Sequence, residues 1–172
     1  IDVTADIETS IPTGQSGSLN PNTRVQYELE DIFTSMGFSV YDGAELTTDF
    51  FNFQSLNIPK NHPARDMQDT LYIKDHPDML MRAHTSEAQA RVMTEQELPI
   101  RTIIPGRVFR NEATDARHEH TFYQIEGIIV DKKINYSHLK YILNDVARKL
   151  FGSKTETRFN PKFYPFVEPG FS

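Results

Sequence analysis

Apolar residues recur at helical spacing in two separate segments of the chain. The first segment begins at Pro21 or Asn22 and ends at Gly37, and the second runs over 137–151 and ends at Gly152. The pattern predicts two amphipathic helices, because residues three and four apart share one helical face. We expect both apolar faces to pack against the rest of the fold, through Val25, Leu29, Ile32 and Phe33 in the first helix and Leu139, Ile142, Leu143, Val146 and Leu150 in the second.

Alternation of apolar and polar residues predicts strands between these helices. Two antiparallel strands are expected over about 101–110 and 121–131, joined by a polar turn. The segment 38–46 has the length and alternation of another strand. Mixed helices and strands without an internal repeat indicate an α+β fold, in which an antiparallel sheet is flanked by helices.

Shorter elements are predicted in the middle of the chain. We expect a short strand at 71–73 and a short helix over 86–96, where the spacing of Ser86 and Gln89 resembles a capping box. The segment 57–70 carries no regular pattern, and a connection of this length is typically functional.

Composition places the chain among ordinary folded domains. With 172 residues, 38% of them hydrophobic and 24% charged, it fits a single domain with its own core. The net charge of −6 argues against binding of nucleic acid through the overall field of the protein. There are no cysteines, so neither disulfides nor thiolate metal sites arise, and no apolar run approaches the ~18 residues of a membrane span. We therefore expect a cytoplasmic protein that makes no membrane contact.

The densest polar group lies around the turn of the predicted hairpin, 107-RVFRNEATDARHEHTFYQIEG-127. An unpaired carboxylate is costly to bury, so a polar face on these strands suggests a binding site with a cation for phosphate, carboxylates for an amine and an aromatic for stacking. An isolated Arg-x-Glu pair is more often a cross-strand pair on the surface. The residues that alternation places on one face are Arg110, Glu112, Phe122, Gln124 and Glu126.

The segment from Arg110 to Gly127 resembles motif 2 of the class II aminoacyl-tRNA synthetases. Nearly the whole chain is similar to the bacterial phenylalanyl-tRNA synthetase alpha subunits, through 17-GSLNP-21, 57-NIPKNHPARDMQDT-70, 84-HTSEAQARVM-93 and 163-FYPFVEPG-170. The resemblance implies a partial class II catalytic domain, with motif 1 at about 21–46 and motif 2 at about 103–131.

The resemblance also implies a reaction in which phenylalanine and ATP give phenylalanyl-adenylate, whose aminoacyl group passes to tRNA(Phe). Arg110 would be the catalytic residue, binding the α-phosphate of ATP and the carboxylate of the amino acid. The remaining implied contacts are Glu112, His118 and Phe122 for ATP, His84, Ser86, Gln89, Gln124 and Glu126 for the amino group of phenylalanine, Tyr164 and Phe166 for its ring, and Glu168 for Mg²⁺.

The implied partner is a beta subunit in an α2β2 heterotetramer, which would also carry the editing activity. The sequence departs from the family pattern at Ala44, where motif 1 commonly has a proline. Motif 3 and the N-terminal coiled-coil arm have no counterpart in these 172 residues, so we expect the isolated chain not to form the adenylate.

Plainer interpretations stay open for several of these residues. His84 is compatible with a structural histidine, Ser86 with a helix cap, and Tyr164 and Phe166 with core aromatics. The alternative function is that of a synthetase-like paralogue, which binds nucleotide or tRNA as a regulatory module without aminoacylation.

Overall fold

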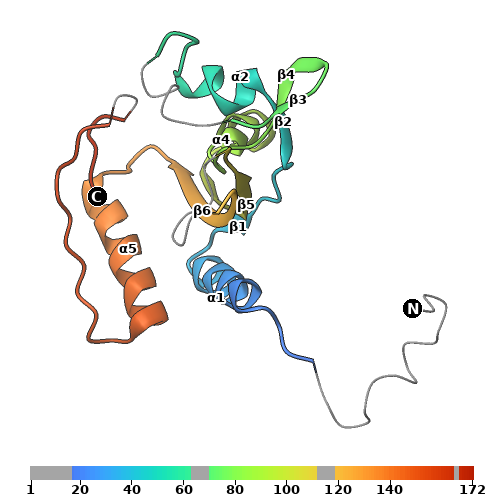
Figure 1. The fold of residues 1–172 in the computed structure, drawn as a ribbon. Coiled ribbons are helices and arrows are strands. Elements are labelled where there is room, and N and C mark those ends of the chain that lie inside the picture. The colour runs from blue at the N-terminus through green and yellow to red at the C-terminus, as the bar shows by residue number, and fades with distance from the viewer. Residues whose placement is uncertain (1–16, 63–69, 112–118, 165–166) are drawn as a thin grey trace.

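The computed structural model describes residues 17–62, 70–111, 119–164 and 167–172 (Figure 1). Its helices are α1 (Pro21–Ser35), α2 (Asp49–Asn52), α4 (Glu87–Glu95) and α5 (Tyr136–Phe151), with a short 3-10 helix η2 (Gln54–Leu56). Its strands are β1 (Ser39–Val40), β2 (Leu46–Thr48), β3 (Tyr72–Ile73), β4 (His76–Met81), β5 (Ile100–Phe109) and β6 (Thr121–Val130). Among the described residues, none of the helices is long and apolar enough to cross a membrane.

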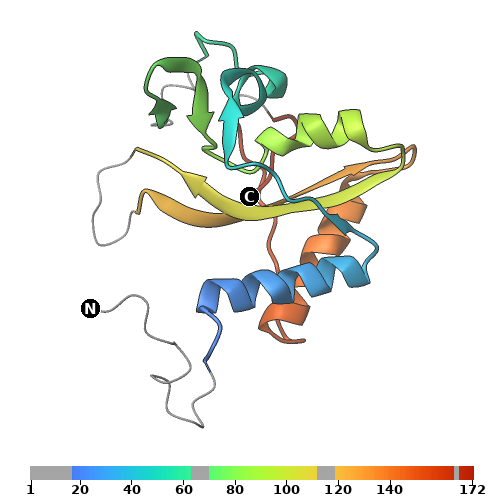
Figure 2. The same cartoon turned by 90° about the vertical axis from the view of Figure 1, so that its right-hand side faces the viewer.

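The strands form two small sheets. One has the order β1-β5-β6, with β1 parallel to β5 and β5 antiparallel to β6, and the other is the antiparallel sheet β2-β4-β3. In Figure 2 the long β5–β6 hairpin crosses the molecule, with α4, α2 and the second sheet on one side and α1 on the other. The expected α+β class, an antiparallel sheet flanked by helices, is confirmed.

The first predicted helix is confirmed as α1. The side chain of Asn20 accepts a hydrogen bond from the backbone N–H of Asn22 at 2.9 Å, and Pro21 occupies the first turn, where a missing N–H costs nothing. Gly37 follows the helix with φ of 85°, a left-handed conformation that glycine adopts without strain.

The predicted antiparallel strands are confirmed as β5 and β6. They pair over ten residues each, and the register sets Ile104 opposite Glu126 and Gly106 opposite Gln124. On one face of β5, Ile100 and Ile104 pack against the helix α4 in a buried cluster with Ala88 and Val92. The hairpin is therefore fixed to α4 through its apolar side chains.

The prediction of one continuous strand over 38–46 is wrong. The segment forms two short strands in different sheets, β1 and β2, because the chain crosses from one sheet to the other between them. At the crossing, the guanidinium of Arg82 donates to the carbonyl of Gly43 at 2.8 Å, and a Cβ on Gly43 would lie 3.0 Å from this group. The crossing depends on this long-range contact, which the local pattern does not contain.

The middle of the chain agrees with the prediction in part. The short strand appears as β3 and the helix as α4, whereas β4 was not predicted. The capping box is wrong: Ser86 precedes α4 but its side chain makes no cap hydrogen bond, because it donates to Glu126 instead.

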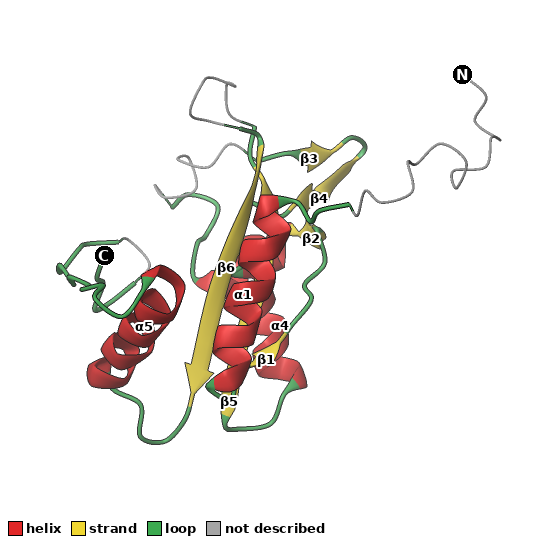
Figure 3. Cartoon of the chain, turned by 90° about the horizontal axis from the view of Figure 1, so that it is seen from below, coloured by secondary structure: helices red, strands yellow, loops and turns green. Residues whose placement is uncertain are grey.

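The helix α5 ends as predicted and begins one residue earlier, at Tyr136, but the prediction that its apolar face is packed is only partly right. No residue of α5 is fully buried, and Leu139 and Leu143 are 43% and 41% exposed. These side chains line an apolar groove of about 520 Å³ between α5, α1 and β6. Figure 3 shows α5 standing to one side of β6, so the helix covers the sheet incompletely.

Candidate functional site

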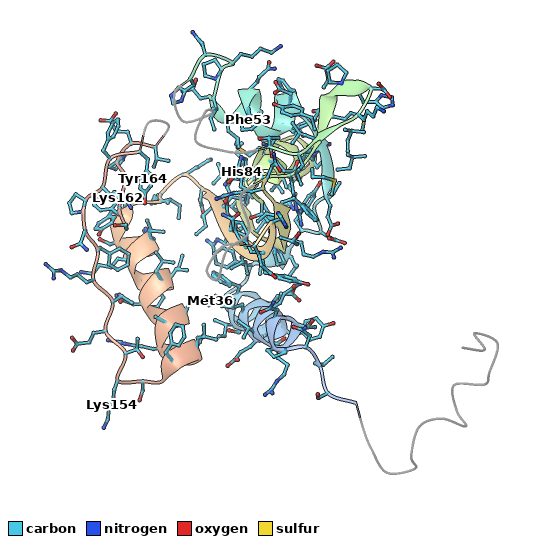
Figure 4. All side chains as sticks on the ribbon, viewed as in Figure 1. Met36, Phe53, His84, Lys154, Lys162 and Tyr164 are labelled. Atoms are coloured by element: carbon cyan, nitrogen blue, oxygen red, sulfur yellow. The ribbon has the colours of Figure 1, made fainter. Side chains whose placement is uncertain are left out.

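A cavity of about 670 Å³ lies at the end of α4 nearest β6 and is closed on one side by the C-terminal segment. It brings together seven residues that the sequence assigned to the site: His84, Ser86, Gln89, Arg110, Gln124, Glu126 and Tyr164. In Figure 4, His84 lies on the central part of the fold and Tyr164 on the C-terminal segment across from it.

The carboxylate of Glu126 accepts three hydrogen bonds from neighbouring side chains. Ser86 Oγ donates at 2.5 Å and Gln124 Nε2 at 3.0 Å to one oxygen, while Gln89 Nε2 donates at 2.9 Å to the other. Gln124 Oε1 is buried and has no hydrogen-bond partner within the described ranges. The cluster therefore holds a carboxylate in one orientation and keeps an amide oxygen available for an incoming donor.

Arg110 supplies the positive charge of the cavity. Its Nε donates to the carbonyl oxygen of Ala83 at 3.1 Å, and its Cζ lies 5.0 Å from the ring centroid of Phe122. Its backbone N–H donates to the carbonyl oxygen of His120 at 2.8 Å, directly beyond the last paired residues of β5 and β6. These contacts hold a permanently charged, planar group at the cavity wall, where it suits a phosphate or a carboxylate.

His84 is a neutral residue of the wall. Only 6% of it is exposed, and neither ring nitrogen makes a well-formed hydrogen bond with the rest of the described chain. Burial lowers the pKa of His84 to about 4, and the charge of Arg110 acts in the same direction, although a backbone contact with Asn52 opposes it. The ring meets Phe53 edge to face, with centroids 6.3 Å apart.

Apolar side chains complete the cavity, and sequence reasoning missed four of them: Leu56, Ile58, Val167 and Phe171. Each is an ordinary apolar residue, so the local sequence does not distinguish it from a residue that only packs in the core. Ile58 lies in the segment 57–70 and Leu56 directly precedes it. The irregular pattern of this segment was the best indication in the sequence that these two residues lie near a functional site.

Some predicted site residues are not brought together. Glu112, His118 and Phe166 lie outside the described residues. Glu168 is exposed and does not line the cavity, and the described part of the chain holds no cluster of three histidines or carboxylates that fits a metal ion. The role of Glu168 toward Mg²⁺ stays a prediction, because Mg²⁺ is usually bound by one or two carboxylates together with phosphates of the substrate.

The arrangement suits a ligand that carries an ammonium group and an oxyanion together. A carboxylate and an amide oxygen can accept hydrogen bonds from the ammonium, and the guanidinium can bind the anion. The apolar wall offers space for a hydrophobic side chain of the same molecule. This combination of groups is chemically compatible with a hydrophobic amino acid.

The arrangement of helices and strands is shared with known proteins. A solved pyrrolysyl tRNA synthetase from Desulfitobacterium hafniense superposes with a TM-score of 0.64 at 13% identity, covering 88% of this chain and 52% of that one. The family model described as tRNA synthetases class II core domain (F) matches residues 3–172, and the chain belongs to this family.

Curated relatives from several bacteria share about half of their aligned residues with this chain. The phenylalanine–tRNA ligase alpha subunit of Leptospira biflexa is 51% identical over 161 residues, covering 94% of this chain and 47% of the relative. That of Cytophaga hutchinsonii is 48% identical over 165 residues, covering 95% and 48%. The chain therefore spans about half the length of the curated relatives it matches.

Proposed function

We propose that the chain is the amino-acid-activating part of a phenylalanine–tRNA ligase alpha subunit. The observation that carries the proposal is that one cavity holds both the carboxylate of Glu126, which accepts three hydrogen bonds, and the guanidinium of Arg110. The names of the relatives, at about half identity over most of this chain, support phenylalanine as the substrate.

The proposed first step joins phenylalanine to ATP. An oxygen of the phenylalanine carboxylate attacks the α-phosphorus, a new P–O bond forms, and the bond from this phosphorus to pyrophosphate breaks. Arg110 stabilises the negative charge that gathers on the α-phosphate oxygens, and the loss of one such preorganised donor typically costs about 10²–10³-fold in rate. Phe122, beside Arg110, is the proposed surface for stacking of adenine.

Recognition of phenylalanine combines charge with shape. Glu126 and the unpaired Oε1 of Gln124 accept from the ammonium group, and the neutral ring of His84 adds no positive charge that would repel it. Tyr164 faces the aromatic ring, together with apolar residues of the wall such as Ile58. An apolar pocket rejects the extra hydroxyl of tyrosine by only ~10²-fold, so discrimination is expected to be moderate at this step.

The second step and the assembly extend the same proposal. The aminoacyl group passes to the 3′ end of tRNA(Phe), in a cytoplasmic α2β2 heterotetramer with a beta subunit and with Mg²⁺ accompanying ATP. The roles of Glu112, His118, Phe166 and Glu168 stay predictions. The regulatory paralogue remains the alternative outcome.

The test is ATP–pyrophosphate exchange by the full-length subunit assembled with its beta partner. We expect exchange that depends on phenylalanine, with much slower exchange for tyrosine and none without an amino acid. ATP binding without phenylalanine-dependent exchange would instead support the regulatory paralogue.

Substitution of Arg110 by alanine tests whether the exchange arises at this cavity. The variant loses the charge that stabilises the reacting phosphate, so we expect the rate to fall by roughly 10²-fold or more. An unchanged rate would remove Arg110 from the mechanism. Arg101→Ala is the matched control, because the Arg101 side chain is 48% exposed and pairs with Asp131 on the surface.

A further inference from the structure

Asn52 is a buried amide that joins two distant parts of the chain. It ends α2, has no exposed surface, and its Oδ1 accepts the backbone N–H of Ala83 at 3.1 Å. Ala83 lies 31 positions further along the chain, in the connection between β4 and α4. The bond therefore ties the short helix to the segment that leads into the cavity.

Ala83 also contacts the catalytic arginine directly. Its carbonyl oxygen accepts from Arg110 Nε at 3.1 Å, so its N–H is held by Asn52 while its carbonyl holds the guanidinium. The next residue is His84, whose ring packs edge-on against Phe53, the residue after Asn52 (Figure 4). A displacement of Ala83 would thus move the anchor of Arg110 and one wall of the cavity together.

The hydrogen-bond partners of the backbone change from main chain to side chain at Ala83. Before it, main-chain bonds fix the chain: Arg82 donates to the carbonyl of Glu45 at 2.9 Å and accepts from the N–H of Phe109 at 2.9 Å. At Ala83 the N–H is held by the side chain of Asn52 instead. The residue whose carbonyl accepts from Arg110 is therefore held at its own N–H by a side-chain amide.

The amide group of Asn52 is not used completely by the fold. Its Nδ2 is buried and lacks a hydrogen-bond partner among the described residues. A buried unpaired N–H destabilises a protein, and such groups call for a reason beyond stability. The acceptor oxygen toward Ala83 supplies that reason.

We propose that Asn52 is a positioning residue that acts on adenylate formation through Ala83 and Arg110. The inference rests on the proposed function, since it assigns Asn52 to the same reaction. Because Arg110 is needed in the transition state, the loss of Asn52 acts on turnover more than on phenylalanine binding.

The test is phenylalanine-dependent pyrophosphate exchange by the full-length subunit assembled with its beta partner. Asn52→Leu removes the acceptor at similar volume, so we expect kcat to fall roughly tenfold to a hundredfold, the range that a small misplacement of a catalytic group produces. The KM for phenylalanine should stay within about twofold. Asn52→Asp keeps an acceptor for Ala83 and should recover most of the kcat.

Gln54→Leu is the matched control for the loss of an amide near α2. Gln54 Nε2 donates to Asp49 Oδ2 at 2.7 Å, whereas the Ala83 N–H is held by Asn52, so the kcat of this variant should equal that of the wild type. If Asn52→Leu does not assemble with the beta subunit, Asn52→Ala takes its place with the same expectation. An equal loss in the Gln54 and Asn52 variants would overturn the proposal.

A double variant separates positioning from a general loss of structure. Arg110→Lys keeps the charge but lacks the Nε–H that donates to Ala83, so in this background Asn52→Leu should lower single-turnover adenylate formation by less than about twofold. If Asn52→Leu lowers the rate by the same factor in the Arg110→Lys background as in the wild type, Asn52 does not act through Arg110, and the inference fails. A wild-type enzyme without phenylalanine-dependent exchange would instead refute the proposed function, and this inference with it.

Discussion

Glu126 obtains its role from residues far away in the sequence. Alternation in the predicted strand placed Gln124 and Glu126 on one face, and the structure confirms this. The other two donors, Ser86 and Gln89, come from positions 40 and 37 residues earlier, so no local pattern links them to the carboxylate. The same long-range bond explains why the capping prediction failed, because the Ser86 hydroxyl is engaged by Glu126.

Replacement of Glu126 by glutamine is predicted to impair binding of phenylalanine. The variant loses the negative charge that faces the ammonium group. Its new amide N–H also points toward the side chains that donate to Glu126, so some of these donors lose their acceptor. A loss of about 1.5–3 kcal/mol is typical for a hydrogen bond to a charged group, or roughly a tenfold to hundredfold increase in KM for phenylalanine.

Exchange kinetics at varied phenylalanine and ATP concentrations measure this effect. The KM for ATP should change little, because Glu126 is assigned to the amino acid. Glu95→Gln serves as control, since Glu95 is exposed and accepts only from Tyr41 in the described contacts. A KM for phenylalanine equal to that of the wild type would contradict the assignment.

His84 predicts a pH dependence of stability with a definite sign. Its pKa falls from 6.5 in the unfolded chain to about 4 in the fold, so the unfolded state binds more protons between these values. The contribution of His84 to the free energy of unfolding is complete above pH 6.5. It decreases by about 3 kcal/mol in total as the pH falls to 4.

Thermal unfolding of the assembled enzyme between pH 7 and pH 4 would detect the effect of His84. Other groups titrate in this range, so the informative quantity is the difference from His84→Asn, which has no imidazole to protonate. The midpoint of the wild type should decrease more steeply with falling pH than that of the variant. Parallel curves would mean that His84 is already able to accept a proton in the fold.

At the scale of elements, the long strands were predicted correctly because the alternation of apolar and polar residues extends over many positions. The β5–β6 hairpin alternates over ten residues in each strand and was predicted almost to its ends. β1 and β2 have two and three residues, too few for alternation to mark where one ends and the other begins. The face of α5 was predicted correctly as apolar, yet its burial depends on neighbours that the pattern does not reveal.

Gly106 in β5 is predicted to tolerate no side chain. A Cβ there would lie 2.0 Å from Nη2 of the buried Arg82, and its φ is 153°. Gly106→Ala should displace the guanidinium and lower stability by about 1–3 kcal/mol or more, the usual cost of overpacking. Gly17→Ala is the control, because nothing lies within 4 Å of its Cβ position.

Native-state hydrogen exchange at the amides of β5 and β6 would measure the effect of Gly106→Ala locally. Faster exchange of these amides is expected in this variant and not in Gly17→Ala. Unchanged protection would show that Arg82 can move aside at little cost.

At the scale of the whole molecule, one buried guanidinium holds the two sheets together. Arg82 follows β4, is 2% exposed, and donates to the carbonyl oxygens of Arg107 in the hairpin at 2.7 Å and of Gly43 in the crossing at 2.8 Å. Burial lowers its pKa, while the negative charge of Glu87 acts in the opposite direction. Sequence analysis assigned Arg82 no role, because its partners are backbone oxygens of segments that only the tertiary fold brings together.

Arg82→Met is therefore predicted to weaken the junction between the sheets. The variant keeps much of the volume but removes the donor to the buried Gly43 carbonyl and to the partly buried Arg107 carbonyl. It also removes a positive charge near the buried Glu87, whose pKa burial already raises. Breaking one side of a buried charge arrangement typically costs about 3–5 kcal/mol, which hydrogen exchange at the amides of β4 and β5 should report. Adding Glu87→Gln should recover part of the loss, because the buried carboxylate, which then keeps the ion pair with Arg91 at 3.5 Å but not the charge of Arg82, is replaced by a neutral amide. Equal exchange protection in Arg82→Met and wild type would mean that apolar packing alone joins the two sheets.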